Sequence, residues 1–158
     1  MVAPLEDVTV VEIDNWMASP SAGAILADLG ANVIKVEPLS GDPMRNMGRP
    51  AKVPDEKKDF DYQFDVSNRG KRSITVDLDS SDGIEVVRSL ISNAQIFMCN
   101  LLKRRQEKFG LEPESVKLLN PKIVHATLTG YGTSGPVSYT HLRAHETKAN
   151  LVCRLLLE

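Results

Sequence analysis

The most informative segment of this chain is Leu26-Ala27-Asp28-Leu29-Gly30-Ala31-Asn32-Val33-Ile34-Lys35-Val36-Glu37-Pro38. It predicts the end of a helix, a turn at Gly30 and a strand over residues 32–36. The strand hardly alternates between apolar and polar residues, which is typical of a parallel strand buried on both faces. A β-branched run over residues 8–13 and a helix that opens at Pro20 precede it. Together these segments predict a right-handed strand–helix–strand unit.

The alternation of strands and helices continues along the chain. We expect further strands over residues 73–78, 95–99 and 123–128, a helix from Ser80 or Ser81 and another from Pro113. Residues 38–65, rich in Gly, Pro, Lys and Asp, predict a long loop. This order predicts an α/β fold: a Rossmann-like open parallel sheet with helices on both faces, present here in incomplete form.

Residues 137–158 resemble the translation of a sequencing adapter in one reading frame, interrupted by an index-like segment at residues 148–150. We therefore divide the chain into residues 1–136, one domain's worth of protein, and a non-native tail over residues 137–158. The alternative is a short amphipathic C-terminal helix, because Leu151, Val152, Leu155 and Leu156 recur at helical spacing.

The charge balance argues against nucleic-acid and membrane-surface partners. Lys and Arg number 19 and Asp and Glu 21, which gives a net charge of −2 at pH 7. The sequence has no apolar run long enough to cross a membrane and no visible signal peptide. Outside the predicted tail, Cys99 stands alone in an apolar run, so we expect a small buried hydrophobe rather than a disulfide partner. These features predict a cytoplasmic protein, with an organelle matrix as the alternative.

Familiar cofactor and metal motifs are missing from the sequence. No G-x-G-x-x-G follows the first predicted strand, and there is no P-loop. His125 has no His or Cys nearby at metal-ligand spacing, so we expect it to be structural. We therefore expect no metal site and no dinucleotide site of the usual kind.

In an open parallel sheet, ligands bind beyond the carboxyl ends of the strands. Polar or flexible segments follow three predicted strands there, at residues 14–17, 100–103 and 130–135. The basic run Lys103-Arg104-Arg105-Gln106-Glu107-Lys108 comes directly after the fourth strand. Two interpretations stay open for this run: a solvated helix face, or cations that meet the phosphates of a ligand.

Four blocks in order resemble the N-terminal part of the family III CoA-transferases, the family of carnitine and formyl-CoA transferases and α-methylacyl-CoA racemases. They are Pro4-Leu5-Glu6, the stretch over residues 26–38, Asn68-Arg69-Gly70-Lys71-Arg72-Ser73 and Thr129-Gly130-Tyr131-Gly132-Thr133-Ser134-Gly135-Pro136. The resemblance covers Pro4 to Pro136 and is specific as a set. It implies that residues 1–136 are the N-terminal part of a CoA-transferase large domain, whose parent is an intertwined homodimer.

The same resemblance implies the reaction of the parent: CoA moves between an acyl-CoA and a small carboxylic acid through an Asp-bound intermediate. The CoA thioester is then a substrate, and no cofactor is expected. The family nucleophile lies in a Gly-Tyr-Asp segment shortly beyond Gly135-Pro136. We therefore expect that no residue of this chain is catalytic and that the chain alone is inactive. Two alternatives stay open: the racemase branch, which has a His-Asp pair there, and a non-catalytic CoA- or nucleotide-binding module.

The resemblance also implies CoA-binding residues: Trp16, Val76, Asn100, Leu101 and Lys108. Asn100 and Lys108 match the family pattern, and Phe109, Gly110 and Leu111 follow as expected. An aromatic residue and a Pro-Gly turn of the family are replaced by Leu101, Lys103 and Arg104, so the local turn could have become helical. Trp16 has packing as its alternative role. Lys71 and Arg72 belong to a recurring basic pair that we interpret as structural ion-pair formers.

Overall fold

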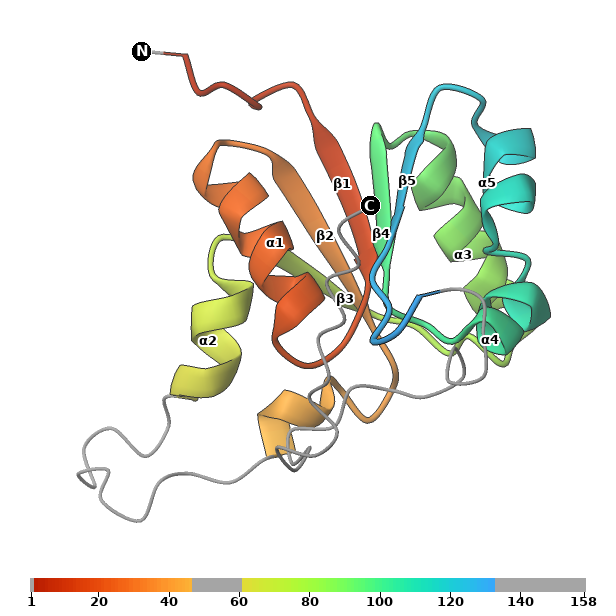
Figure 1. Cartoon of the computed structure of the whole chain (residues 1–158), viewed down its shortest axis with the longest axis horizontal. Coiled ribbons are helices and arrows are strands. Elements are labelled where there is room, and N and C mark those ends of the chain that lie inside the picture. Colours follow the sequence, from red (N-terminus) through yellow and green to blue (C-terminus); the bar gives the residue numbers. More distant parts are fainter. Residues whose placement is uncertain (1, 47–60, 133–158) are drawn as a thin grey trace, which may run out of the picture. The chain divides into compact units, whose positions relative to one another are not determined.

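The computed structural model describes residues 2–46 and 61–132, in which strands and helices alternate (Figure 1). The chain divides into two compact units, Met1–Leu128 and Thr129–Glu158. The predicted boundary at residue 136 and the predicted tail lie outside the described residues and stay predictions. In chain order the elements are β1 (Thr9–Ile13), α1 (Ala18–Asp28), β2 (Asn32–Glu37), η1 (Pro43–Asn46), α2 (Tyr62–Asn68), β3 (Arg72–Thr75), α3 (Ser81–Ser92), β4 (Ile96–Cys99), α4 (Lys103–Phe109), α5 (Pro113–Leu119) and β5 (Val124–Thr127).

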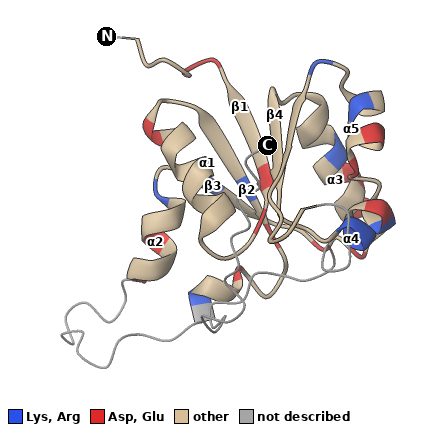
Figure 2. Cartoon of the chain, in the orientation of Figure 1, with Lys and Arg blue, Asp and Glu red and all other residues tan. Residues whose placement is uncertain are grey.

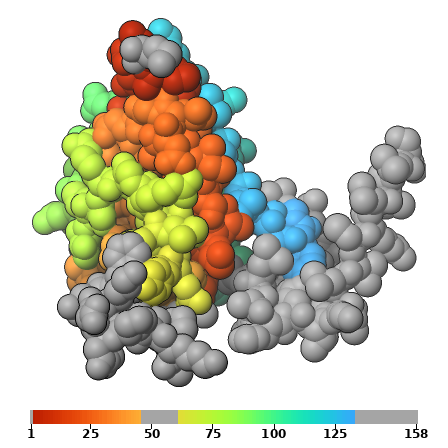
Figure 3. All heavy atoms as spheres, turned by 90° about the vertical axis from the view of Figure 1, so that its left-hand side faces the viewer, coloured from red at the N-terminus to blue at the C-terminus, as the bar shows by residue number. Residues whose placement is uncertain are grey.

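The first unit is built on a five-stranded sheet in the order β3-β2-β1-β4-β5. Every adjacent pair is parallel, with Val10 opposite Val33 and Val11 opposite Phe97. Helices α1 and α2 lie side by side on one face, and α3, α4 and α5 cover the other (Figures 1 and 3). The predicted α/β fold with an open parallel sheet is confirmed, in the strand order of a Rossmann half with two further strands.

Each face of the sheet carries its own apolar core. Val11, Phe97 and Cys99 belong to the larger cluster, which includes residues of α3 and α5. Val10 and Val33 belong to the smaller one, against which residues of α1 pack. Because neighbouring residues of a strand point to opposite faces, a strand covered on both faces is apolar along most of its length. The buried state predicted for Cys99 is confirmed, and burial raises the pKa of its thiol to about 11.

Three local expectations need correction. Helix α1 begins at Ala18, ahead of Pro20, because the first turn of a helix has free N–H groups and tolerates a residue without one. Strand β3 is shorter than predicted and ends at Thr75. Helix α2 lies partly within the predicted loop over residues 38–65, where Asp61 caps it by accepting the Phe64 N–H at 3.2 Å.

Two further features concern possible sites. The ring of His125 meets Phe97 edge-on, with centroids 5.2 Å apart, and its Nε2 lies 3.3 Å from the Leu111 carbonyl oxygen. These contacts give it the structural role expected. Within residues 2–46 and 61–132, no group of three His, Cys, Asp or Glu could hold a metal ion, and no helix is long and apolar enough to cross a membrane.

Candidate ligand site at the carboxyl ends of the strands

The loops after β1 and β4 meet at the carboxyl end of the sheet, where the strand order switches direction on either side of β1. Asn100, directly after β4, joins them. The Asn15 N–H donates to Asn100 Oδ1 at 3.1 Å, and Asn100 Nδ2 donates to the Asn15 carbonyl oxygen at 2.7 Å. The side chain of Asn100 therefore holds the turn after β1 in place, and both ends of its amide are engaged in doing so.

Trp16 occupies that turn in an uncommon backbone conformation. Its φ of 69° lies in the left-handed region, which bulky residues rarely adopt. Its backbone N–H donates to Asp42 Oδ1 at 3.3 Å, while its side chain is 45% exposed. A fixed backbone thus places the indole at the carboxyl end of the sheet.

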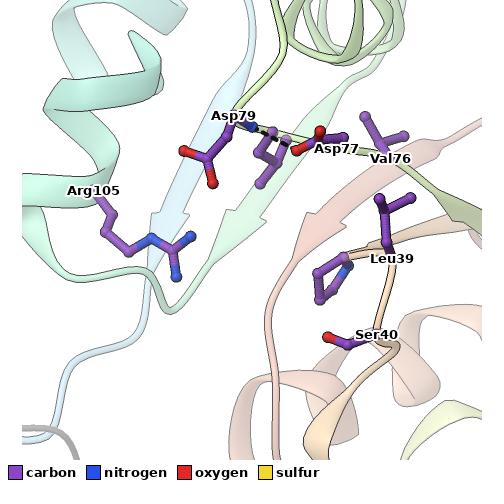
Figure 4. Close-up of a pocket in the computed structure, with 8 residues that line it drawn as sticks. Leu39, Ser40, Val76, Asp77, Asp79 and Arg105 are labelled. Carbon is purple, nitrogen blue, oxygen red and sulfur yellow. Dashed lines mark hydrogen bonds between the residues drawn. The ribbon is translucent and has the colours of Figure 1, made fainter.

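A hollow of about 290 Å³ opens between the loops after β2 and β3 and helix α4 (Figure 4). We call it the edge hollow. Arg105 lies on one side of it and Leu39 and Ser40 on the other (Figure 4). Its lining residues are Pro38, Leu39, Ser40, Val76, Asp77, Leu78, Asp79 and Arg105.

Two of the predicted residues, Val76 and Leu101, lie in different environments. Val76 is largely buried yet lines the edge hollow. Leu101 is buried in the larger core cluster, and its carbonyl oxygen accepts from Gln106 Nε2 at 2.7 Å. Of the five residues predicted to bind CoA, Val76 is the one that lines the edge hollow.

The basic run after β4 forms helix α4, so the turn of the family has become helical here, as its sequence suggested. Figure 2 shows both basic and acidic residues along this helix. Lys103 is exposed, and its Nζ lies 3.9 Å from Glu107 Oε1 on the same helix, which agrees with the interpretation as a solvated helix face. Arg105 lines the edge hollow, and Lys108 forms an ion pair with Asp79 of the lining, which lowers the pKa of that carboxyl.

Arg105 and Asp79 were not singled out from the sequence. Arg105 could have been found, because it lies three residues before Lys108 and so on the same face of a helix. Asp79 carried no such signal, since its partner is on an element 29 positions away. The ion pair means that Lys108 is already engaged by a carboxylate.

Beneath the turn after β1 lies a buried charge cluster, formed by Glu12, Asp14, Lys35, Asp42 and Lys71. The ammonium nitrogen of Lys35 is 3.2 Å from Asp14 Oδ1, 3.0 Å from Asp42 Oδ2 and 3.7 Å from Glu12 Oε1. Lys71 lies 2.5 Å from Glu12 Oε1 and donates to the Pro20 carbonyl oxygen at 2.7 Å. Three carboxylates therefore share two ammonium groups, and the structural ion-pair role inferred for Lys71 agrees with these contacts.

The cluster perturbs its acids in the direction that burial dictates. Burial, reinforced by the charge of Asp14, raises the pKa of Glu12 to about 7 against the attraction of Lys71. Burial also raises the pKa of Asp14. Glu37, the neighbouring acid on β2, behaves in the opposite way: burial alone would raise its pKa, but hydrogen bonds from Arg45, Ser73 and a backbone N–H lower it to about 2.

The sequence held a signal for part of this cluster. Glu12 and Lys35 both occur in strands that read as buried, and a charge in such a strand needs a partner. The register places Glu12 directly opposite Lys35 on the adjacent strand. Asp42 lies in the predicted loop, where nothing in its neighbours indicated that it is fully buried.

Comparisons with known proteins agree with the fold and the blocks described above. The profile of CoA-transferase family III matches residues 5–151. The chain is 40% identical over 135 residues to a succinate–glutarate CoA-transferase of Agrobacterium fabrum, covering 84% of this chain and 34% of that protein. It is 36% identical over 138 residues to the human succinyl-CoA:glutarate CoA-transferase, covering 87% of this chain and 30% of the relative.

A solved structure is similar as well. The crystal structure of a CAIB/BAIF family protein from Brucella suis superposes with a TM-score of 0.79 at 37% sequence identity, covering 89% of this chain and 37% of that one. The chain thus spans about a third of the length of the relatives that it matches.

Proposed function

The chain belongs to CoA-transferase family III, and we propose that the whole protein moves CoA between an acyl-CoA thioester and a small carboxylic acid. Relatives at 35–40% identity carry names of CoA-transferases, which supports acyl-CoA transfer as the reaction. The proposal further includes an Asp-bound intermediate, a homodimer and a cytoplasmic setting. In that reaction an enzyme carboxylate attacks the thioester carbonyl and expels the CoA thiolate, and a mixed anhydride forms. The thiolate then attacks the enzyme-side carbonyl of the anhydride, which releases the donor acid as a free carboxylate and leaves an enzyme-bound CoA thioester. The acceptor carboxylate repeats these two steps in reverse, so that it leaves as its CoA thioester and the enzyme carboxylate is restored.

The observation that carries the proposal is the chemistry of the edge hollow. Leu39, Val76 and Leu78 offer apolar surface for a flat base, and Arg105 offers a guanidinium fork. A nucleotide needs both, since its base is apolar on its faces and its phosphates favour planar, charge-assisted donors. The position at the carboxyl ends of parallel strands is where open sheets bind such ligands.

The carboxylate of Asp79 opposes the binding of a phosphate in the edge hollow. This carboxylate and that of Asp77 both line the hollow, and each repels an incoming phosphate. Lys108 must also exchange its partner Asp79 for a phosphate before it can contribute to binding. We therefore propose that CoA binding breaks the Lys108–Asp79 pair, and that Arg105 provides the first cationic contact.

Trp16 and Asn100 have different parts in this proposal. The exposed indole of Trp16 provides apolar surface for the acyl and pantetheine portion, whereas Asn100 acts through the turn that it holds. Replacing Asn100 by Ala should weaken CoA binding with little dependence on salt, because no charge is lost.

Titration of CoA into the purified chain by calorimetry tests the proposal. Arg105→Ala and Lys108→Ala should each weaken binding by about tenfold or more, since each removes a charge-assisted contact. The loss should shrink as salt rises, because phosphate attraction is screened. Asp79→Asn should tighten binding by a few-fold, because it frees Lys108 and removes a repulsive charge.

Lys103→Ala is the matched control, a cation on the same helix whose described partner is Glu107. Its affinity for CoA should equal that of the unaltered chain. Equal losses in Lys103→Ala and Arg105→Ala would mean that α4 attracts CoA only through its overall charge. For the whole protein, transfer from succinyl-CoA to glutarate is the first assay, because relatives act on that pair by name; absence of turnover with a broad set of acids would refute the reaction.

A further inference from the structure

The turn that presents Trp16 is held from both neighbouring strands. On the β4 side, Asn100 binds both backbone polar groups of Asn15. On the β2 side, Asp42 accepts the backbone N–H of Trp16. Neither contact involves the indole, so the two side chains restrain the backbone and leave the side chain free to meet a ligand.

Asp42 is itself fixed from three directions. It is fully buried, and its Oδ1 also accepts the Met44 N–H at 2.9 Å. Its own N–H donates to Glu37 Oε2 at 2.9 Å. Its second oxygen lies 3.0 Å from the ammonium of Lys35. A buried carboxylate with this many donors around it has one position, and the Trp16 N–H is directed at it.

Lys35 contacts both the start of the turn, at Asp14, and the carboxylate of Asp42. The same ammonium that faces Asp42 donates to the carbonyl oxygen of Asp14 at 2.8 Å, at the start of the turn. One buried cation thus contacts the residue where the turn begins and the carboxylate that holds Trp16. The register that places Lys35 opposite Glu12 brings it there.

The conformation of Trp16 requires such restraint. A bulky residue with φ near 69° persists only where its surroundings enforce it, and such positions concentrate at functional sites. Burial does not enforce it here, because Trp16 is 45% and Met17 54% exposed. We propose that Asp42, anchored by Lys35, is a positioning residue: it holds the backbone of Trp16 so that the indole stands at the carboxyl edge of the sheet, ready for the acyl-CoA. The identity of that ligand rests on the proposed function, whereas the positioning does not.

Trp16 is the single tryptophan of the chain, so its fluorescence reports on this turn alone. Asp42→Ala removes the acceptor, and Asp42→Asn keeps an oxygen at the same place. Asp28→Asn is the matched control, an exposed acid paired with Arg69. We expect lower fluorescence anisotropy and stronger acrylamide quenching of Trp16 in Asp42→Ala, values near those of the unaltered chain in Asp42→Asn, and no change in Asp28→Asn. Far-UV circular dichroism establishes that each variant compared is folded, so a general loss of stability would not produce this pattern.

The unaltered chain provides a second test that needs no variant. The Trp16 amide should exchange its hydrogen about ten- to a hundredfold more slowly than an unstructured peptide amide, because it donates to a buried carboxylate. Exchange at the unstructured rate, or anisotropy of Trp16 unchanged in a folded Asp42→Ala, would overturn the proposal. If Asp42→Ala does not fold, the exchange rate decides by itself.

CoA affinity tests whether the position of Trp16 matters for ligand binding. If the proposed function holds, CoA should bind Asp42→Ala about tenfold more weakly than Asp28→Asn, because the ligand must then order the turn itself. If the unaltered chain binds no CoA, the proposed function fails for this chain, while anisotropy and exchange still decide whether Asp42 positions Trp16. Equal CoA affinities in Asp42→Ala and Asp28→Asn would remove the link between the turn and the ligand.

Discussion

Raising the pH from about 4.5 to about 8 should destabilise this chain through Glu12. In the unfolded chain this carboxyl titrates near its ordinary value of 4.5, and in the folded protein burial raises its pKa to about 7. Between these values the folded state keeps a proton that the unfolded state has lost. The stability that the protonated group confers is complete below the unfolded pKa and is lost as the pH rises through the folded one.

The size of the effect follows from the difference between the pKa values of Glu12 in the unfolded and folded states. Each pKa unit corresponds to about 1.4 kcal/mol, so Glu12 alone accounts for roughly 3 kcal/mol across this range. That is a large share of the roughly 5–15 kcal/mol by which most domains are stable. The physical origin is the burial of Glu12, reinforced by the charge of Asp14, which outweighs the attraction of the Lys71 and Lys35 ammonium groups.

Urea denaturation at about pH 5 and about pH 8 measures the effect. Glu12→Gln mimics the protonated acid, so its stability should change less between these conditions than that of the unaltered chain. Burial also raises the pKa of Asp14, which leaves a slope of the same sign in this variant. Glu37→Gln is the matched control on the adjacent strand. The pKa of Glu37 is about 2, so this acid is ionised throughout the range and its replacement should leave the slope unchanged. If the unaltered chain and Glu12→Gln lose stability in parallel, the reasoning is wrong.

Three further changes should alter stability by amounts that the packing sets. A Cβ at Gly23 would lie 1.9 Å from Glu12 Oε2, so Gly23→Ala should cost about 1–3 kcal/mol, read as a lower urea midpoint; an unchanged midpoint would contradict the packing of α1 on Glu12. Ile91→Ala empties a fully buried site and should cost about 2–5 kcal/mol by the same measurement, against under about 0.5 kcal/mol for the exposed Ile25→Ala. Ser80→Ala removes the hydroxyl that accepts the Gly83 N–H at 3.0 Å, and should lower the thermal midpoint by the equivalent of about 1 kcal/mol, with Ser81→Ala as the neighbouring control.

The parallel sheet could be predicted from the order of residues along the chain. A strand covered on both faces is mostly apolar with little alternation, and residues 32–36, 95–99 and the region after Pro121 each show this pattern next to a turn or cap. The same pattern located the loops at the carboxyl ends, and with them Trp16 and Asn100. These inferences succeed because the residues concerned are constrained by their own neighbours along the chain.

Which side chains meet at those loops could not be predicted in this way, because it depends on how distant elements pack. Lys35 faces Glu12 and Asp42 because of strand register and a loop that folds back under the turn. Lys108 meets Asp79 because α4 lies next to the loop that follows β3. Helix α2 is equally a product of packing, since seven residues make a helix too short to form without its contacts to α1. Pairings between distant elements depend on how those elements pack, and no local spacing of residues encodes that.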